Sequence, residues 1–145
     1  MKNINLSMDF FLGGKSTFTV QNTANGEHRT YKIRKSRPNP RYPNPAWFLS
    51  QMTGSDNESH YSSIGRINPD TGAVTLTRIS RFEEGSPVLK AARWVCSKIF
   101  LNQPIPDCIE VRHAGKCGRC GRTLTTPESL DRGIGPECWH IMGHA

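Results

Sequence analysis

At 145 residues the chain has the length of one domain, and no stretch approaches the roughly 18 consecutive apolar residues of a membrane span. Its net charge of +7, with a pI near 9.5, favours an anionic partner such as nucleic acid and carries no information about the fold. The N-terminus lacks the apolar region of a signal peptide, which predicts a cytoplasmic protein with reduced cysteines.

The positive charge is unevenly distributed along the chain. Residues 28–55 contain six lysines and arginines and no acidic residue, and residues 111–124 contain four more, again without an acidic residue. Such segregation predicts a basic face. The candidate nucleic-acid contacts on this face are Arg29, Lys32, Arg34, Lys35, Arg37, Arg41, Arg119 and Arg122.

The first predicted elements form a β-hairpin. Residues 16–20 are β-branched and aromatic, and Asn25-Gly26 is a strong signal for a two-residue turn. In residues 29–34, Tyr31 and Ile33 alternate with polar residues, which indicates one buried face. The opposite face is expected to carry Arg29, Lys32 and Arg34.

For the middle of the chain, the sequence predicts a loop, a short helix and a second hairpin. Residues 37–45 contain four prolines and are expected to form a loop, followed by one or two helical turns at 46–49. A second hairpin is predicted from strands at 61–68 and 73–80, because Gly72 can take the positive φ that its turn requires.

A longer helix is expected to begin at Ser86-Pro87 and to end before Pro104. Serine is a favourable N-cap and proline suits the first helical position. One face of this helix is apolar and predicts packing on a sheet; its members are Val88, Ala91, Ala92, Val95, Cys96 and Ile99.

The predicted fold class is α+β, with two antiparallel hairpins, a packed helix and a C-terminal treble-clef-like zinc lobe. Residues 1–104 are expected to form the sheet-and-helix lobe and residues 105–145 the zinc-knuckle lobe, within one compact unit.

The zinc prediction comes from the spacing of cysteines near the C-terminus. Cys117 and Cys120 form a C-x-x-C pair between glycines, and two thiolates on such a turn can hold one ion. Cys138 follows Gly135-Pro136, which predicts a helix start, and the dipole of that helix favours a thiolate. These three residues, with His113 as the fourth ligand, are the predicted Zn²⁺ site.

The fourth ligand is open to alternatives. His113 precedes the C-x-x-C pair by three residues and is favoured, followed by His144 and then His140, with Cys108 as a further candidate. A thioredoxin-like redox pair is disfavoured because no βαβ unit surrounds the motif and Cys138 would have no role in it. Cys96 and Cys108 are expected to be core residues.

The C-terminal motif resembles a phage-associated zinc-knuckle family of unknown function. The similarity lies in C-G-R-C-G-R-T-L-T-T-P-E-S-L at 117–130 and G-I-G-P-E-C at 133–138, and residues 14–20 and 29–33 resemble the strand pair that precedes the knuckle in that family. The resemblance implies a phage protein in the bacterial cytoplasm, with metal ligands at Cys117, Cys120, Cys138 and His113. It implies no activity.

The function predicted from these features is a binding module, with nucleic acid as the expected partner through the basic face. The alternative is a protein that binds and inhibits a host bacterial enzyme or an anti-phage defence system. An enzyme is not expected, since the H-x-E and P-C-x-x-C pair of zinc deaminases is absent. Neither a membrane nor a small-molecule substrate is expected.

Overall fold

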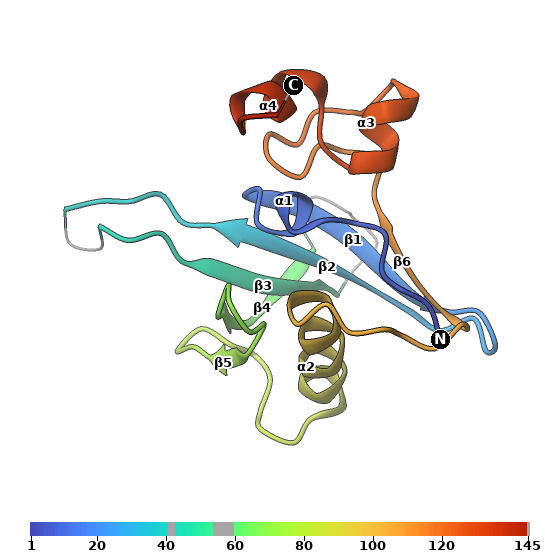
Figure 1. Ribbon diagram of the computed structural model, residues 1–145. Coiled ribbons are helices and arrows are strands. Elements are labelled where there is room, and N and C mark those ends of the chain that lie inside the picture. Colours follow the sequence, from blue (N-terminus) through green and yellow to red (C-terminus); the bar gives the residue numbers. More distant parts are fainter. Residues whose placement is uncertain (41–42, 54–59, 145) are drawn as a thin grey trace.

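In the computed structural model, which describes residues 1–40, 43–53 and 60–144, six antiparallel strands form one sheet in the order β5-β4-β3-β2-β1-β6 (Figure 1). The predicted α+β class is therefore confirmed. The strands are β1 (Lys15–Asn22), β2 (His28–Lys35), β3 (Trp47–Met52), β4 (Tyr61–Ile67), β5 (Val74–Leu76) and β6 (Ile109–His113). The helices are α1 (Met8–Phe11), α2 (Pro87–Phe100), α3 (Pro127–Arg132) and α4 (Pro136–Ile141).

The first hairpin forms where the sequence predicts it, with a longer turn. β1 and β2 pair in a register that places Phe18 opposite Tyr31 and Ser16 opposite Ile33, and all four side chains are buried on one face. The loop between the strands spans residues 23–27, so the predicted two-residue turn is wrong. Gly26 has φ +78° and its N–H donates to the carbonyl of Asn22 at 2.8 Å, which closes this wider turn.

The helix predicted at 46–49 is wrong, because this segment belongs to β3. β3 pairs with both β2 and β4. Its backbone N–H and C=O groups therefore form hydrogen bonds that an isolated helical turn would lack. Aromatic residues such as Trp47 and Phe48 also suit a pleated strand. The second predicted hairpin is present as β4 and β5, and Gly72 adopts φ +76°, although β5 ends at Leu76.

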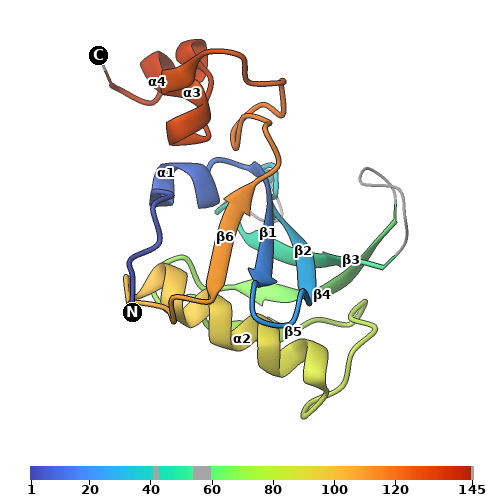
Figure 2. The same ribbon diagram turned by 90° about the vertical axis from the view of Figure 1, so that its right-hand side faces the viewer.

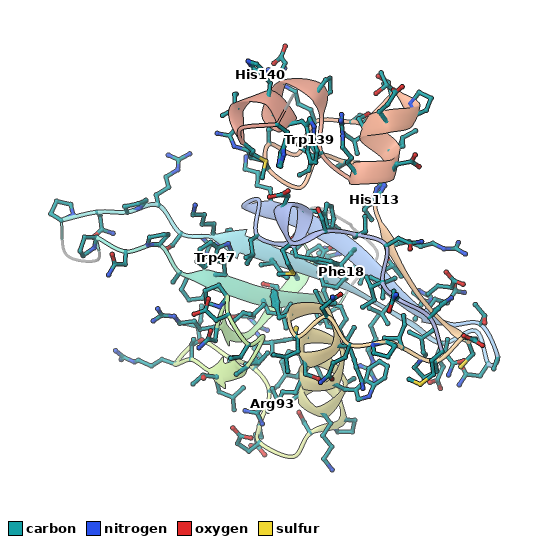
Figure 3. All side chains as sticks on the ribbon, in the orientation of Figure 1. Phe18, Trp47, Arg93, His113, Trp139 and His140 are labelled. Atoms are coloured by element: carbon teal, nitrogen blue, oxygen red, sulfur yellow. The ribbon has the colours of Figure 1, made fainter. Side chains whose placement is uncertain are left out.

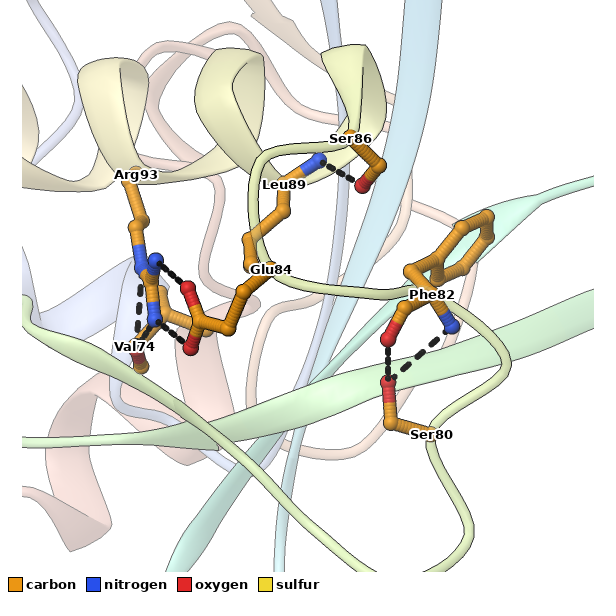
Figure 4. Close-up of polar contacts among 7 residues, drawn as sticks. All are labelled: Val74, Ser80, Phe82, Glu84, Ser86, Leu89 and Arg93. Carbon is orange, nitrogen blue, oxygen red and sulfur yellow. Dashed lines mark hydrogen bonds and ion pairs between the residues drawn. The ribbon is translucent and has the colours of Figure 1, made fainter.

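Helix α2 covers the sheet face that carries Phe18 and Tyr31 (Figure 2). Its predicted start is confirmed: the Ser86 hydroxyl accepts the N–H of Leu89, and Pro87 opens the helix (Figure 4). Arg93 anchors α2 to the sheet edge, since its guanidinium donates to the carbonyl of Val74 and pairs with Glu84 at 2.6 Å (Figure 4). The buried face contains Leu89, Ala92, Val95, Cys96, Ile99 and Phe100, whereas Val88 and Ala91 are half-buried.

Helix α1 joins the sheet to residues 114–144, which we call the C-terminal segment. The Phe11 ring packs edge-on against Phe18 at 5.1 Å between centroids, and Phe10 lies next to Phe11 and near the β6 residue His113. The core continues from α2 through these rings to Cys117 and Cys138. β6 pairs with β1, so part of the segment predicted as the zinc lobe completes the sheet. No helix in the described ranges is long and apolar enough to cross a membrane.

The free energy of unfolding is expected to fall at alkaline pH. Burial raises the pKa of Tyr31 to about 12 and that of the Cys96 thiol also to about 12. The folded protein therefore retains protons that the unfolded chain releases near pH 9 to 10, so stability present below pH 9 is lost as the pH rises towards 12. Between pH 8 and pH 11, urea titrations should show a smaller loss of unfolding free energy for Cys96→Ala than for the unmodified chain. Equal losses would contradict this assignment.

Candidate metal centre and basic groove

Three thiols from two elements meet in the C-terminal segment. Cys117 and Cys120 lie on the turn that follows β6, and Cys138 lies in the first turn of α4. Their sulfur atoms all lie within 4.8 Å of one another. Thiolates about 2.3 Å from a tetrahedral zinc ion are about 3.8 Å apart, so this arrangement fits a single metal ion. The structure thus brings together the three cysteines that the spacing predicts.

Backbone hydrogen bonds fix the turn that carries Cys117 and Cys120. The Cys117 N–H donates to the carbonyl of Arg122 at 2.8 Å, and the Gly121 N–H donates to Cys117 at 2.9 Å. Gly121 has φ +81°, a conformation that glycine adopts without strain. The Gly118 N–H donates to the carbonyl of Gly133 at 2.8 Å, which ties this turn to the segment leading into α4.

Helices α3 and α4 bring Cys138 to the turn. α3 begins with a capping box in which the hydroxyls of Thr126 and Ser129 accept each other's backbone N–H, a feature that the sequence analysis missed despite its T-P-E-S signal. α3 ends at Gly133, whose φ of +72° reverses the chain. α4 then begins at Pro136 with Gly135 as N-cap, as predicted, and presents Cys138 to the other thiols.

The surroundings of the thiols favour a thiolate at Cys117. Burial raises the pKa of this thiol, but backbone N–H groups of Gly135, Cys120 and Arg119 donate to its sulfur and bring the pKa down to about 7. Burial and the neighbouring thiols raise the pKa of Cys138, while the Arg119 guanidinium, 3.5 Å from its sulfur, lowers it. Such a set of amide and guanidinium donors stabilises the thiolate, which is the form of cysteine that binds a metal ion.

His113, the predicted fourth ligand, does not belong to this cluster. Its Nδ1 accepts the N–H of Gly115 at 2.8 Å, so its Nε2 carries the proton and donates to the carbonyl of Leu130. Both ring nitrogens are therefore engaged, Nδ1 with the turn that follows β6 and Nε2 with α3. The ring lies between the C-terminal segment and the sheet (Figure 3), where it serves to hold the two together.

The other candidates for the fourth ligand also lie apart. The His144 ring stacks on Trp139 with 3.8 Å between centroids, and its Nε2 is 3.0 Å from a carboxylate oxygen of Asp9. His140 is exposed on the outer side of α4 (Figure 3). Cys108 precedes β6, at the end of that strand opposite His113. Within the described ranges, the three thiols are the only cluster of at least three metal-ligating side chains.

The sheet face opposite α2 carries a groove of about 760 Å³, which we call the basic groove. It runs over β1 and β2 to the turn that bears Cys120 and Gly121. Three threonine hydroxyls, from Thr17, Thr19 and Thr30, lie along it, and no acidic side chain is among the described residues that line it. Its basic lining residues are Lys15, His28, Lys32, Arg34 and Lys116.

The structure divides the predicted basic residues between several surfaces. Lys32 and Arg34 line the basic groove, whereas Arg29 lies on the opposite face of β2, in a hollow beside Trp94 of α2. Strand residues an odd number apart point to opposite faces, which explains why Arg29 and Arg34 do not lie together. The Lys35 ammonium lies 5.3 Å from the Trp47 ring centroid, away from this groove.

The remaining predicted contacts lie elsewhere. Arg37 lines a separate hollow beside Phe48 and Arg66, and Arg41 is outside the described residues. Arg119 and Arg122 extend from the cysteine turn into a second cavity, beside Cys138. The predicted contacts omit Lys15, His28 and Lys116, although strand parity places Lys15 and His28 with Lys32 and Arg34.

No phenylalanine, tyrosine or tryptophan is among the described residues that line the basic groove. Tyr31 is buried beneath α2, and the Trp47 indole N–H donates to the carbonyl of Leu12 at 3.1 Å. Two cations on the open face lie over aromatic rings: Lys32 over Tyr61 at 4.2 Å and Arg34 over Phe48 at 5.5 Å. Tyr61 and Phe48 therefore lie beside two cations of the basic groove without lining it.

Comparison with known proteins gives one match, and it covers the thiol cluster. No curated protein and no solved structure matches the chain. The match begins within β6, includes Cys117, Cys120 and Cys138, and extends beyond α4. The strand pair β1–β2, which also carried the resemblance seen in the sequence, lies outside it. Residues 110–143 of this chain are thus similar to DUF6011, a family of unknown function.

Proposed function

We propose that Cys117, Cys120 and Cys138 hold one Zn²⁺ ion that stabilises the C-terminal segment. Three clustered thiols with amide donors on the sulfur suit a soft or borderline ion, and zinc is the usual occupant of such sites in reduced proteins. The ion would be coordinated by the cysteine turn and by α4 at the same time, and would thereby hold these two elements together. No catalytic role is proposed for it.

We further propose that the basic groove binds the phosphate backbone of nucleic acid. The observation that carries this proposal is the convergence of Lys15, Lys32, Arg34 and Lys116 on one hollow face, whose described lining residues include no acidic side chain. Lysine and arginine supply the non-specific affinity of nucleic-acid binders, and the rings of Tyr61 and Phe48 lie beside two of these cations, Lys32 and Arg34. The described residues that line the groove come from strands and from the turn that follows β6, and none comes from a helix, so sequence preference should be slight.

The test compares two arginines of the same strand. Arg34→Gln should weaken binding of single- and double-stranded DNA and RNA at low salt, because it removes a phosphate contact in the groove. Arg29→Gln removes the same charge from the opposite face and should leave affinity nearly unchanged. Anisotropy titrations at several salt concentrations should give a slope of log K against log salt of roughly −3 to −4, reduced by about one in Arg34→Gln.

Equal effects of the two variants would show that net charge, and not the groove, attracts nucleic acid. If no nucleic acid binds at low salt, the alternative of a protein-binding inhibitor of a host enzyme or defence system becomes the leading proposal. The phage origin and bacterial cytoplasm proposed here are supported by the resemblance of the C-terminal motif alone.

A further inference from the structure

The thiol cluster supplies three ligands, whereas zinc in proteins takes four. Among the described residues, no histidine or carboxylate atom joins the three sulfurs. The two histidines that the sequence favoured as fourth ligand are engaged: both nitrogens of His113 are hydrogen-bonded, and His144 pairs with Asp9. A metal ion held by these cysteines would therefore have one position not filled by the described part of the chain.

A cavity of about 350 Å³ lies directly beside this cluster, and we call it the thiol pocket. Cys120 and Cys138 form part of its wall, together with the apolar side chains of Leu124 and Ile141. Two of the three sulfur-bearing residues thus face a solvent-accessible hollow. Its volume suits a small ligand or a single side chain.

The charged residues of the thiol pocket are two arginines and one glutamate. The Arg119 guanidinium lies 3.5 Å from the Cys138 sulfur. Arg122 lies 3.6 Å from the Glu137 carboxylate, and both of these side chains are largely exposed, so their pairing is weak. Three thiolates around a divalent cation carry one net negative charge, and the two guanidinium groups can offset that charge and that of an added anion.

We propose that the three-cysteine metal centre keeps its fourth position open to the thiol pocket, where it takes a small monodentate anion. This inference rests on the proposed metal centre. The three sulfurs hold the ion, Arg119 neutralises the sulfur of Cys138, and Arg122 attracts the anion at the mouth of the pocket. Leu124 and Ile141 restrict the ligand to a small size.

The experiment uses the full chain loaded with Co²⁺ in place of zinc, because the d–d absorption of cobalt reports its ligands directly. Azide and thiocyanate are titrated as anionic probes, with neutral imidazole for comparison. Saturable changes in the d–d bands are expected with both anions, at constant cobalt content after desalting. Arg122→Gln should weaken the apparent anion affinity about two- to fivefold. Arg78→Gln, which removes an exposed charge outside the pocket, should not change it.

The outcomes separate this inference from the proposal on which it rests. A chain that fails to bind cobalt overturns both. A chain that binds cobalt with unchanged d–d bands at every anion concentration has a closed site, which overturns the open position alone. A cobalt-dependent dimer in gel filtration would show that a second copy supplies the fourth ligand. Equal anion affinities for Arg122→Gln and the unmodified chain would overturn the role of Arg122.

Discussion

Replacing Cys138 by serine is expected to release the metal and to unfold the segment from about residue 114 to the C-terminus. The segment has little apolar core of its own, with Leu124 and Ile134 as its buried aliphatic residues. Metal binding to a structural zinc site contributes about 10–16 kcal/mol in small zinc-finger peptides, far more than these contacts can supply. Hydrogen exchange measured by mass spectrometry should show loss of protection in α3 and α4.

The sheet should retain its protection in this variant, because the core between the sheet residues Phe18 and Leu49 and the α2 residue Val95 does not depend on the three clustered thiols. Cys108→Ser is the matched control: it removes a half-buried thiol outside the cluster and should leave the metal and α4 in place. A Cys138→Ser protein with normal protection in α3 and α4 would contradict the account of a metal-stabilised segment.

Replacing Phe10 by alanine is expected to have the second-largest effect, because this side chain joins the cysteine turn to the sheet. Phe10 is fully buried, and the backbone of the C-terminal segment packs directly on it. A Cβ atom added at Gly118 would lie 2.6 Å from the Phe10 carbonyl oxygen, and one at Gly133 would lie 2.6 Å from its ring. Gly118 and Gly133 have no side chains that could move into the space that the ring leaves.

Truncation of a buried phenylalanine costs about 3–5 kcal/mol, which corresponds to a fall in the thermal midpoint of roughly 10 °C for a chain of this size. Phe48 is half-buried on the open face of the sheet, so Phe48→Ala should lower the free energy of unfolding by less. The measurement is thermal unfolding of both variants in the metal-loaded state, and a loss for Phe10→Ala no larger than that for Phe48→Ala would contradict the proposed role of Phe10.

The features that the sequence predicts correctly depend on neighbouring residues. Ser86 and Pro87 specify the start of α2, and Gly135-Pro136 specifies α4, through interactions within a single helical turn. The spacing of Cys117 and Cys120 likewise reflects local turn geometry. Such signals need no knowledge of the rest of the fold.

The features that the sequence does not predict depend on distant partners. The short apolar run at 46–49 is compatible with helix or strand, and pairing with β2 and β4 decides in favour of the strand. His113 has suitable spacing for a ligand, but Gly115 and Leu130 occupy both of its nitrogens, and the position of Leu130 depends on α3. The separation of Arg29 from Arg34 was predictable, since strand parity alone determines it.

The most direct test of the central claim is metal analysis combined with X-ray absorption at the zinc edge, on protein purified without chelators. One zinc per chain is expected, with three sulfur ligands at about 2.3 Å and one lighter ligand at about 2.0 Å. Protein without bound zinc, or zinc with one sulfur ligand or none, would contradict the claim that Cys117, Cys120 and Cys138 together hold the ion.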